Sequence, residues 1–221
     1  MQHWRLLIAG VLIPSLSLAH SEMGARPSVA APTEAHVSIP AHWRPCGSAN
    51  ESYAIRSEHA VVHSGVASAS LASRSRDAPA DRFGAFCQTT LGEPFRGRRV
   101  SFSAYIRTEA VNGGARVWLR ADARGVPVAF DNMGVNFIRG THEWARYTVA
   151  VDVPLEADRL FYGVALQGAG QVWVDDASFA IDGRALPHAD TFGDDSLGDP
   201  SRPLVPVPTN LDFEDTIAIG E

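Results

Sequence analysis

The chain has 221 residues, a formal net charge of −6 at pH 7 and 45% hydrophobic residues. This length fits one domain of ordinary size with flanking segments. The negative charge argues against a nucleic-acid partner, which would favour a basic patch. Beyond the N-terminus no stretch approaches the roughly 20 apolar residues that span a bilayer, so no membrane insertion is expected after the N-terminal segment is removed.

The first 19 residues are organised like a secretory signal peptide. A single positive charge at Arg5 precedes an apolar run from Leu6 to Leu18, and the small residues Ser17 and Ala19 stand where a signal peptidase reads the chain. The alternative, an uncleaved membrane anchor, needs a longer apolar run. We therefore expect cleavage after Ala19 and a periplasmic or secreted protein.

Two segments without hydrophobic periodicity flank the predicted folded part. Residues 20–40 are rich in Ala, Pro and Ser and predict a disordered leader, whereas residues 183–208 crowd Gly, Asp and Pro together and predict a linker. A folded domain is therefore expected over residues 41–182. Residues 209–221 form a C-terminal segment, which either returns to the domain as an edge strand or is the remnant of a following repeat.

The two cysteines, Cys46 and Cys87, both lie in the part of the chain after the signal segment. In an oxidising compartment an even number of cysteines indicates a disulfide, which would tie the start of the domain to the strand around Phe86. The alternative is two separate buried thiols. Neither cysteine has a neighbouring base at a spacing that would mark it as a nucleophile.

Short segments of the central region alternate between apolar and polar residues, as strands with one buried face do. Val100–Arg107 and Arg116–Asp122 alternate on either side of a predicted turn at Asn112–Gly114, and we expect the two to pair as a hairpin. Three further strands are expected at Trp144–Val153, Leu160–Gln167 and Gln171–Phe179. Without a helical period between them, these segments predict an all-β, antiparallel sandwich.

An ordered series of short motifs runs through residues 50 to 181 and ends with one further motif near the C-terminus. The motifs are His63-Ser64-Gly65, Phe83-Gly84 with Gln88, Phe95 to Val100, Phe130 to Met133, Gly140-Thr141 with Trp144, Asp152-Val153-Pro154, Gly163, Gly170 to Asp176, and Asn210 to Glu214. As a set they resemble a galactose-binding-like jelly roll, the fold of many carbohydrate-binding modules. The set is also similar to bacterial exported proteins of unsettled function. In such modules the Asn-x-x-Phe-Glu segment normally opens the domain, whereas here it closes the chain.

The resemblance points to carbohydrate or another small polar ligand, and the first candidate site is the exposed face of the predicted hairpin. Tyr105 and Arg107 would share this face with Trp118 and Arg120. Flat aromatic rings complement the apolar C–H faces of sugars, and planar guanidiniums complement their hydroxyl edges. The alternative is that Trp118 packs under a loop and the arginine stems cover the sheet.

The second candidate is the loop that contains Asp131 and Asn132, which would lie at the rim of that face. Asp and Asn are also ordinary turn residues, because their side chains accept hydrogen bonds from nearby backbone N–H groups. The turn interpretation is favoured unless the loop faces the ligand.

The third candidate is a structural calcium site, which the resemblance implies. The positions that match are Asp176 and Glu214, with Asp175 as a substitute. Calcium takes six to eight oxygen ligands, several of which are backbone carbonyls that a sequence does not reveal. The alternative is a set of solvated acids on separate loops.

No catalytic motif is present in the sequence. There is no Gly-x-Ser-x-Gly elbow, no His-Glu-x-x-His zinc motif and no marked pair of acids, and the histidines are scattered. We therefore expect a non-catalytic binding module. The alternatives are a structural or protein-interaction domain of the cell envelope, and a hydrolase with an unrecognised site.

Overall fold

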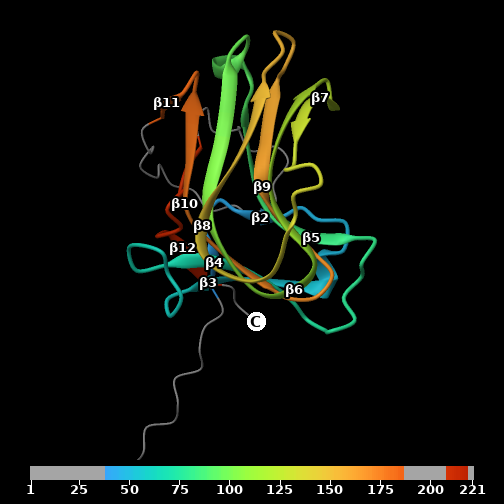
Figure 1. The fold of residues 1–221 in the computed structure, drawn as a ribbon. Coiled ribbons are helices and arrows are strands. Elements are labelled where there is room, and N and C mark those ends of the chain that lie inside the picture. The colour runs from blue at the N-terminus through green and yellow to red at the C-terminus, as the bar shows by residue number, and fades with distance from the viewer. Residues whose placement is uncertain (1–37, 187–207, 219–221) are drawn as a thin grey trace, which may run out of the picture. The chain divides into compact units, whose positions relative to one another are not determined.

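The structure is a computed structural model that describes residues 38–186 and 208–218 (Figure 1). All described residues belong to one compact unit of the chain. The predicted signal segment and most of the predicted linker lie outside the described residues. The strands are β1 (Ser38–Pro40), β2 (Arg44–Pro45), β3 (Tyr53–Glu58), β4 (Ser68–Ser73), β5 (Phe83–Leu91), β6 (Arg99–Ala123), β7 (Val126–Asp131), β8 (Ile138–Asp152), β9 (Arg159–Gln167), β10 (Gln171–Ile181), β11 (Arg184–Ala185) and β12 (Thr216–Ala218).

The helical content of the described residues is two short 3-10 turns, Asn50–Ser52 and Glu93–Phe95. Every strand pairing is antiparallel. The predicted all-β, antiparallel fold is therefore confirmed. In the described ranges, no helix has both the length and the apolar character needed to cross a membrane.

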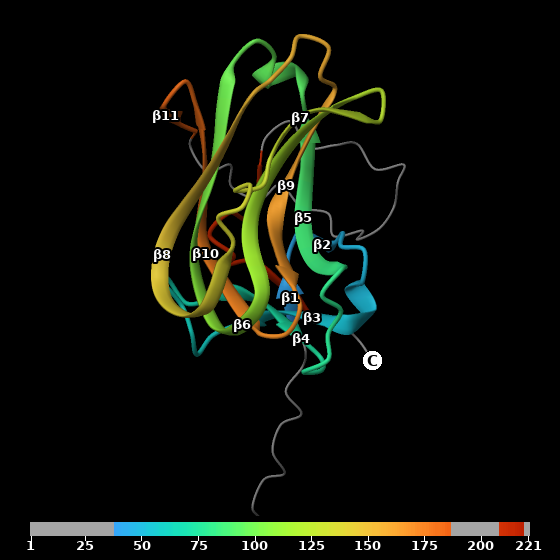
Figure 2. The ribbon, with the colours of Figure 1, turned by 45° about the vertical axis from the view of Figure 1, so that its right-hand side comes forward.

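The 25-residue strand β6 joins the two layers of the sandwich. Its first half pairs with β10 and β8, and its second half pairs with β9 and β7. Figure 2 shows β6 running down one layer, bending at the bottom of the view and rising in the other, with β8 following the outside of the bend. The hairpin predicted at Asn112–Gly114 is therefore wrong, because the strand continues through these residues.

Gly113 lies where β6 passes from its first set of pairings to its second. A Cβ atom at this position would lie 2.2 Å from the carbonyl oxygen of Gln167 at the end of β9. Only glycine lets the two backbones approach so closely. The Asn-Gly-Gly composition that reads as a hairpin turn instead allows a long strand to pass from one layer to the other.

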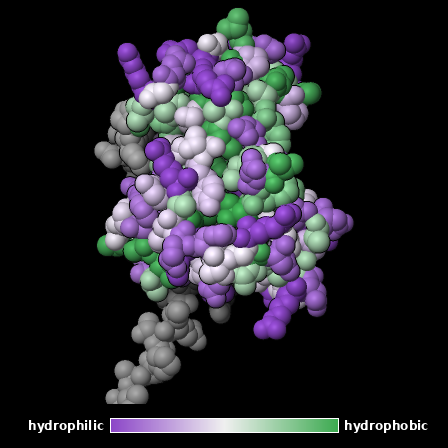
Figure 3. All heavy atoms as spheres, in the orientation of Figure 1, coloured by the Kyte–Doolittle hydropathy of each residue, from purple (hydrophilic) through white to green (hydrophobic). Residues whose placement is uncertain are grey.

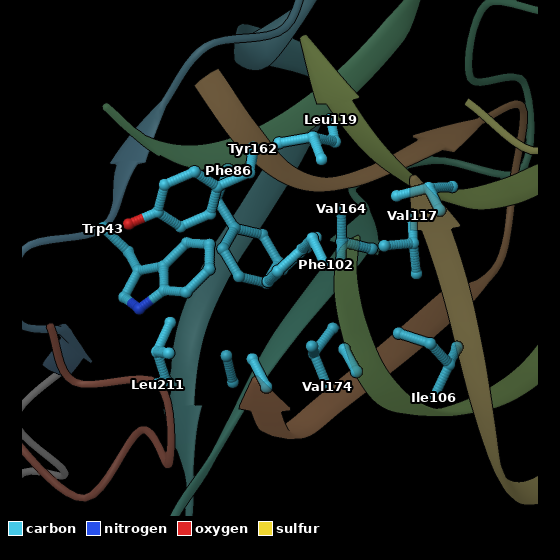
Figure 4. Close-up of a cluster of buried hydrophobic side chains, with 14 of the residues drawn as sticks. Trp43, Phe86, Phe102, Ile106, Val117, Leu119, Tyr162, Val164, Val174 and Leu211 are labelled. Atoms are coloured by element: carbon cyan, nitrogen blue, oxygen red, sulfur yellow. The ribbon is translucent and has the colours of Figure 1, made fainter. Parts of the chain in front are cut away.

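The hydrophobic core lies between the layers β3-β4-β10-β6-β8 and β2-β5-β9-β6-β7. Residues alternate along each half of β6: Val100, Phe102, Ala104 and Ile106 are buried in the first half, and Val117, Leu119 and Ala121 in the second. Figure 4 shows Phe102 and Val164 meeting in this core. The residues between the buried ones therefore point outward, on the two opposite surfaces of the sandwich.

Both ends of the described chain enter the core together. Leu211 and Phe213 are buried beside Trp43 (Figure 4), whose ring stacks on Phe213 at 4.9 Å between centroids. β1 pairs with β12 as a two-stranded sheet. The predicted disulfide between Cys46 and Cys87 is confirmed, and it fixes the chain beside β2 to β5.

Candidate functional site

The four side chains predicted to share one face lie on opposite surfaces of the sandwich. Tyr105 and Arg107 belong to the first half of β6, which pairs with β10, whereas Trp118 and Arg120 belong to the second half, which pairs with β9. The prediction of a single face is therefore wrong, for the reason that the predicted hairpin is wrong. We call the two outer surfaces the β10 face and the β9 face.

Trp118 stands in the middle of the β9 face. It is opposite Gly163 of β9, which itself has no room for a side chain, because a Cβ there would lie 2.1 Å from the Phe86 carbonyl oxygen. The side chain is partly exposed, whereas its Nε1 is buried and has no hydrogen-bond acceptor in the described part of the chain. A partly exposed aromatic ring therefore borders a strip of backbone without a side chain.

Arg120 is held rigidly on the same face. Its guanidinium pairs with the buried carboxylate of Asp122 through Nε–Oδ1 (2.7 Å) and Nη2–Oδ2 (2.9 Å), and it lies 4.7 Å from the centre of the Phe161 ring. Across the other edge of the strand stands Phe130 of β7, which is 55% exposed. The row Phe130–Arg120–Phe161 thus presents two aromatic rings around one fixed guanidinium.

Arg116 lies on the other side of Trp118, two residues along β6. Its Cζ is 4.0 Å from the centre of the Phe137 ring, and its Nη2 donates to Oε1 of Gln167 (2.7 Å). The ring of Phe137 has a second guanidinium beside it, that of Arg139, at 5.6 Å. Burial lowers the pKa of Arg116 from its usual value, because desolvation disfavours the charged form.

The aromatic side chains of the β10 face are already engaged with one another. The ring of His63 stacks on Tyr105 at 3.8 Å between centroids and meets Trp144 edge-on. Arg107 lies 5.2 Å from the centre of the Trp173 ring and pairs with Glu143. These rings therefore have internal partners, unlike Trp118.

An open groove of about 580 Å³ lies at one end of the β10 face. Its floor includes Gln171 of β10 with its two cross-strand neighbours, Ala72 and Glu109. Arg74 and Arg76 also line it. The volume is within the range of small-ligand sites.

The predicted metal ligands Asp176 and Glu214 bind the loop of residues 63–67, a contact that was not predicted from the sequence. Asp176 accepts a hydrogen bond from the Ser64 hydroxyl (2.8 Å) and contacts Nδ1 of His63 (2.5 Å), and Glu214 accepts one from the backbone N–H of Val66 (2.9 Å). Each acid thus binds a different part of residues 63–67. Among the described residues no three His, Cys, Asp or Glu side chains are grouped to hold a metal ion. Calcium at this position stays a prediction from the resemblance.

Asp175, the predicted substitute ligand, is buried against the same loop. Its Oδ2 accepts hydrogen bonds from the backbone N–H groups of His63 (2.7 Å) and Ser64 (3.1 Å). Burial raises the pKa of Asp175 above its usual value, and these hydrogen bonds oppose the shift. Because its acceptor positions face N–H donors, Asp175 has the surroundings of a loop anchor.

Asp131 and Asn132 serve local structure. Asp131 accepts hydrogen bonds from the N–H groups of Met133 (3.0 Å) and Ala150 (3.0 Å), and Asn132 accepts one from Gly134 (3.2 Å). These contacts are those of the turn interpretation. Neither side chain lies in the cross-strand row that contains Trp118.

Sequence reasoning missed two aromatic residues of the β9 face, Phe137 and Phe161. Phe161 was recoverable, because the alternation of β9 places it outward and pairing brings it opposite Arg120. Phe137 precedes β8 in a loop, where no period marks the direction of a side chain.

No protein-family model matches the chain. A curated relative is the "Uncharacterized HTH-type transcriptional regulator YbfP" of Bacillus subtilis (strain 168), 32% identical over 157 residues, which are 71% of this chain and 50% of that protein. The chain therefore spans about half the length of this relative. The described residues of the present chain contain no helical element longer than a 3-10 turn of three residues, and therefore no helix-turn-helix.

Several of the solved structures that match are carbohydrate-binding modules. One is the module TmCBM61, solved in complex with β-1,4-galactotriose (TM-score 0.44, 14% identity, 64% of this chain and 90% of that one). Another is the C-terminal family 22 carbohydrate-binding module of Clostridium thermocellum Xyn10B (TM-score 0.46, 16% identity, 66% and 89%). A third is the enzymatically active domain of bacteriophage CBA120 tailspike protein 4 (TM-score 0.49, 16% identity, 63% and 19%).

Proposed function

We propose that this protein is an exported, non-catalytic carbohydrate-binding domain that holds its ligand on the β9 face. The observation that supports this most is the partly exposed ring of Trp118, which stands between two anchored arginines. A sugar ring stacks its C–H face on an aromatic ring and offers hydroxyl oxygens to N–H donors. The site needs little ordering before it binds, because its flanking side chains are already fixed.

The β9 face is favoured over the β10 face because Trp118 and Phe130 have neither a stacked ring nor a guanidinium over them among the described residues, although Phe137 and Phe161 do. On the β10 face, Tyr105 is covered by His63 and Trp173 by Arg107. A ligand there would first have to displace these contacts. On the β9 face, Phe130 has no ring partner among the described residues and is more than half exposed.

Export fits the disulfide, since such bonds persist in oxidising compartments such as the periplasm and the extracellular space. The signal peptide over residues 1–19 and cleavage after Ala19 remain part of this proposal. Calcium, if bound, would act as a structural ion near Asp176 and Glu214, away from the face that holds the ligand.

Binding to a panel of neutral and acidic polysaccharides, such as xylan, β-1,4-galactan and polygalacturonate, tests the proposal. Wild type is expected to bind at least one of them and to change its Trp fluorescence. Trp118→Ala is expected to weaken that binding severalfold, since a stacked aromatic contact is worth about 0.5–1.5 kcal/mol. Trp144→Ala on the β10 face is the matched control. Equal binding by wild type and Trp118→Ala would overturn the assignment of the face.

A second candidate function is protein interaction within the envelope. It is favoured by β7, where Val126, Val128 and Phe130 are 61%, 37% and 55% exposed. Figure 3 shows hydrophobic side chains on the upper right of the view, where β7 lies in Figure 1. Exposed apolar residues on an edge strand favour contact with another protein. The double variant Val126→Ser with Val128→Ser distinguishes protein interaction from carbohydrate binding, because it changes the exposed apolar residues of β7 and leaves Trp118 intact.

A further inference from the structure

Two arginines share one aromatic ring at the end of the β9 face. The guanidinium carbons of Arg116 and Arg139 lie 4.0 and 5.6 Å from the centre of the Phe137 ring. The two cations are therefore no farther apart than the sum of these distances, roughly 10 Å, which is comparable to the Debye length at 0.1 M salt. Their mutual repulsion is incompletely screened.

Neither cation has an acidic partner in the described ranges, unlike many arginines of this chain. Arg116 donates to the amide oxygen of Gln167, and Arg139 donates to the backbone carbonyl of Gly113 (2.8 Å). By contrast, six arginines form ion pairs with Asp or Glu: Arg82, Arg96, Arg98, Arg99, Arg107 and Arg120. The protein as a whole has a net charge of −6, so acids are not scarce.

Arg116 is also partly desolvated. Its Nε is buried and has no hydrogen-bond partner among the described residues. Burying part of a guanidinium without a counter-charge costs free energy, and burial accordingly lowers its pKa. An anion bound between the two guanidiniums would offset the repulsion between the two arginines.

The cluster adjoins the ring that we assign to sugar binding. Arg116 and Trp118 are two residues apart on β6 and point to the same side, so their Cα atoms are about 7 Å apart. A ligand stacked on Trp118 would place a substituent of an adjacent unit against Arg116.

We propose that the ligand of the β9 face is an acidic glycan, whose carboxylate or sulfate groups are bound by Arg116 and Arg139. This inference rests on the proposed function, because it names the class of glycan that the same face would bind. Guanidiniums bind such groups through two parallel hydrogen bonds and are weakly hydrated, which suits a partly buried anion site. Stacking on Phe137 holds both arginines in place for that contact.

Binding of the full chain to four polysaccharides tests the inference: polygalacturonate for carboxylate, dextran sulfate for sulfate, and xylan and β-1,4-galactan as neutral references. Wild type is expected to bind at least one acidic polymer at least tenfold more tightly than either neutral one. Raising NaCl from about 0.05 to about 0.5 M should weaken only the acidic interaction, because salt screens exposed charges. Which of the two acidic polymers binds better identifies the anionic group.

The double variant Arg116→Gln with Arg139→Gln is expected to lose at least tenfold in affinity for the acidic polymer and to keep its affinity for any neutral one. Arg99→Gln is the matched control, because Arg99 is exposed and paired with Asp152. If the double variant does not fold, Arg139→Gln alone reports on the site, since Arg139 is exposed and is expected to lose at least threefold.

Two outcomes separate this inference from the proposed function. If acidic and neutral polymers bind equally and the double variant is unchanged, the inference is overturned while the carbohydrate function stands. If no polymer binds, both are overturned. A third outcome is that Arg99→Gln weakens binding of the acidic polymer as much as the double variant does. This would mean that the attraction is diffuse, and it would also overturn the inference.

Discussion

The indole N–H of Trp43 donates a hydrogen bond to the backbone carbonyl of Asn210 (3.0 Å), across 167 residues of sequence. Both groups are buried, and Phe213 stacks on the same indole. The side-chain amide of Gln88 on β5 adds a second link, because its Nε2 donates to the carbonyl of Thr209 (2.7 Å). The C-terminal segment is thus bound by side chains from the start and the middle of the domain.

Asn210 provides the first prediction. Its Nδ2 donates to the carbonyls of Ala41 (2.9 Å) and Asp215 (2.8 Å), and its Oδ1 accepts from the N–H of Asp215 (3.0 Å). Asn210→Ala removes all three hydrogen bonds, of which the one to Ala41 is buried, and its φ of 45° suits Asn better than Ala. We expect a loss of about 3 kcal/mol in the free energy of unfolding, measured with urea. Asp212→Asn is the control, and an equal effect of both would contradict this role.

The disulfide provides the second prediction. Cys46 and Cys87 are separated by 41 residues, and closing a loop of this length in the unfolded chain is worth about 3–4 kcal/mol in the entropic model. The double variant Cys46→Ser with Cys87→Ser should lose about this amount under non-reducing conditions. Adding a reductant should destabilise wild type and leave the variant unchanged. A wild type that is indifferent to reductant speaks against the bond in solution.

The antiparallel fold was predicted from local sequence patterns. The hairpin expected at Asn112–Gly114 is the exception, and it shows what such patterns do not determine. The alternation of Val100–Arg107 and of Arg116–Asp122 gave the direction of each side chain correctly. It did not determine whether the two segments form a hairpin or one strand, since both arrangements place the same residues inside. The deciding contact is between Gly113 and Gln167, which are 54 positions apart, and no local pattern contains it.

The candidate site was recovered only in part for the same reason. Trp118 and Arg120 were found from alternation, but their true neighbours, Phe161 and Phe130, come from strands whose pairing was not predicted. The stack of His63 on Tyr105 joins a loop to a strand. Such contacts depend on tertiary pairing, which residue types alone do not specify.

Glu214 provides the third prediction, which also tests calcium. Its Oε1 accepts a hydrogen bond from Val66 N–H, and a Cβ at Gly65 would collide with it. Glu214→Ala should destabilise the domain by about 1–3 kcal/mol, because it removes an acceptor for this loop. Thermal unfolding in EDTA and in excess CaCl₂ separates the two roles. A loss of similar size in both buffers indicates a loop anchor, whereas a loss seen only with calcium indicates a metal ligand.

Asp182 provides the last prediction, which concerns acid stability. Its carboxylate accepts hydrogen bonds from Nε of Arg98 (2.6 Å) and from the backbone N–H of Arg99 (3.0 Å), and these bonds lower its pKa below the usual 3.8. A lowered folded-state pKa means that the unfolded state binds the proton more readily. The stabilisation is therefore complete above about pH 4 and is lost as the pH falls through the folded-state pKa.

The pKa of Asp182, measured by carboxyl NMR titration of the folded protein, should lie below 3.8 and rise in Arg98→Gln, which removes its strongest hydrogen-bond donor. Thermal stability of Asp182→Asn should depend less steeply on pH than that of wild type between about pH 2 and pH 4. Asp152, which is exposed and pairs with Arg99, is the matched control as Asp152→Asn. If Arg98→Gln leaves the titration midpoint of Asp182 unchanged, this hydrogen bond is not made in solution. A carboxylate released from its donor must titrate closer to the ordinary value.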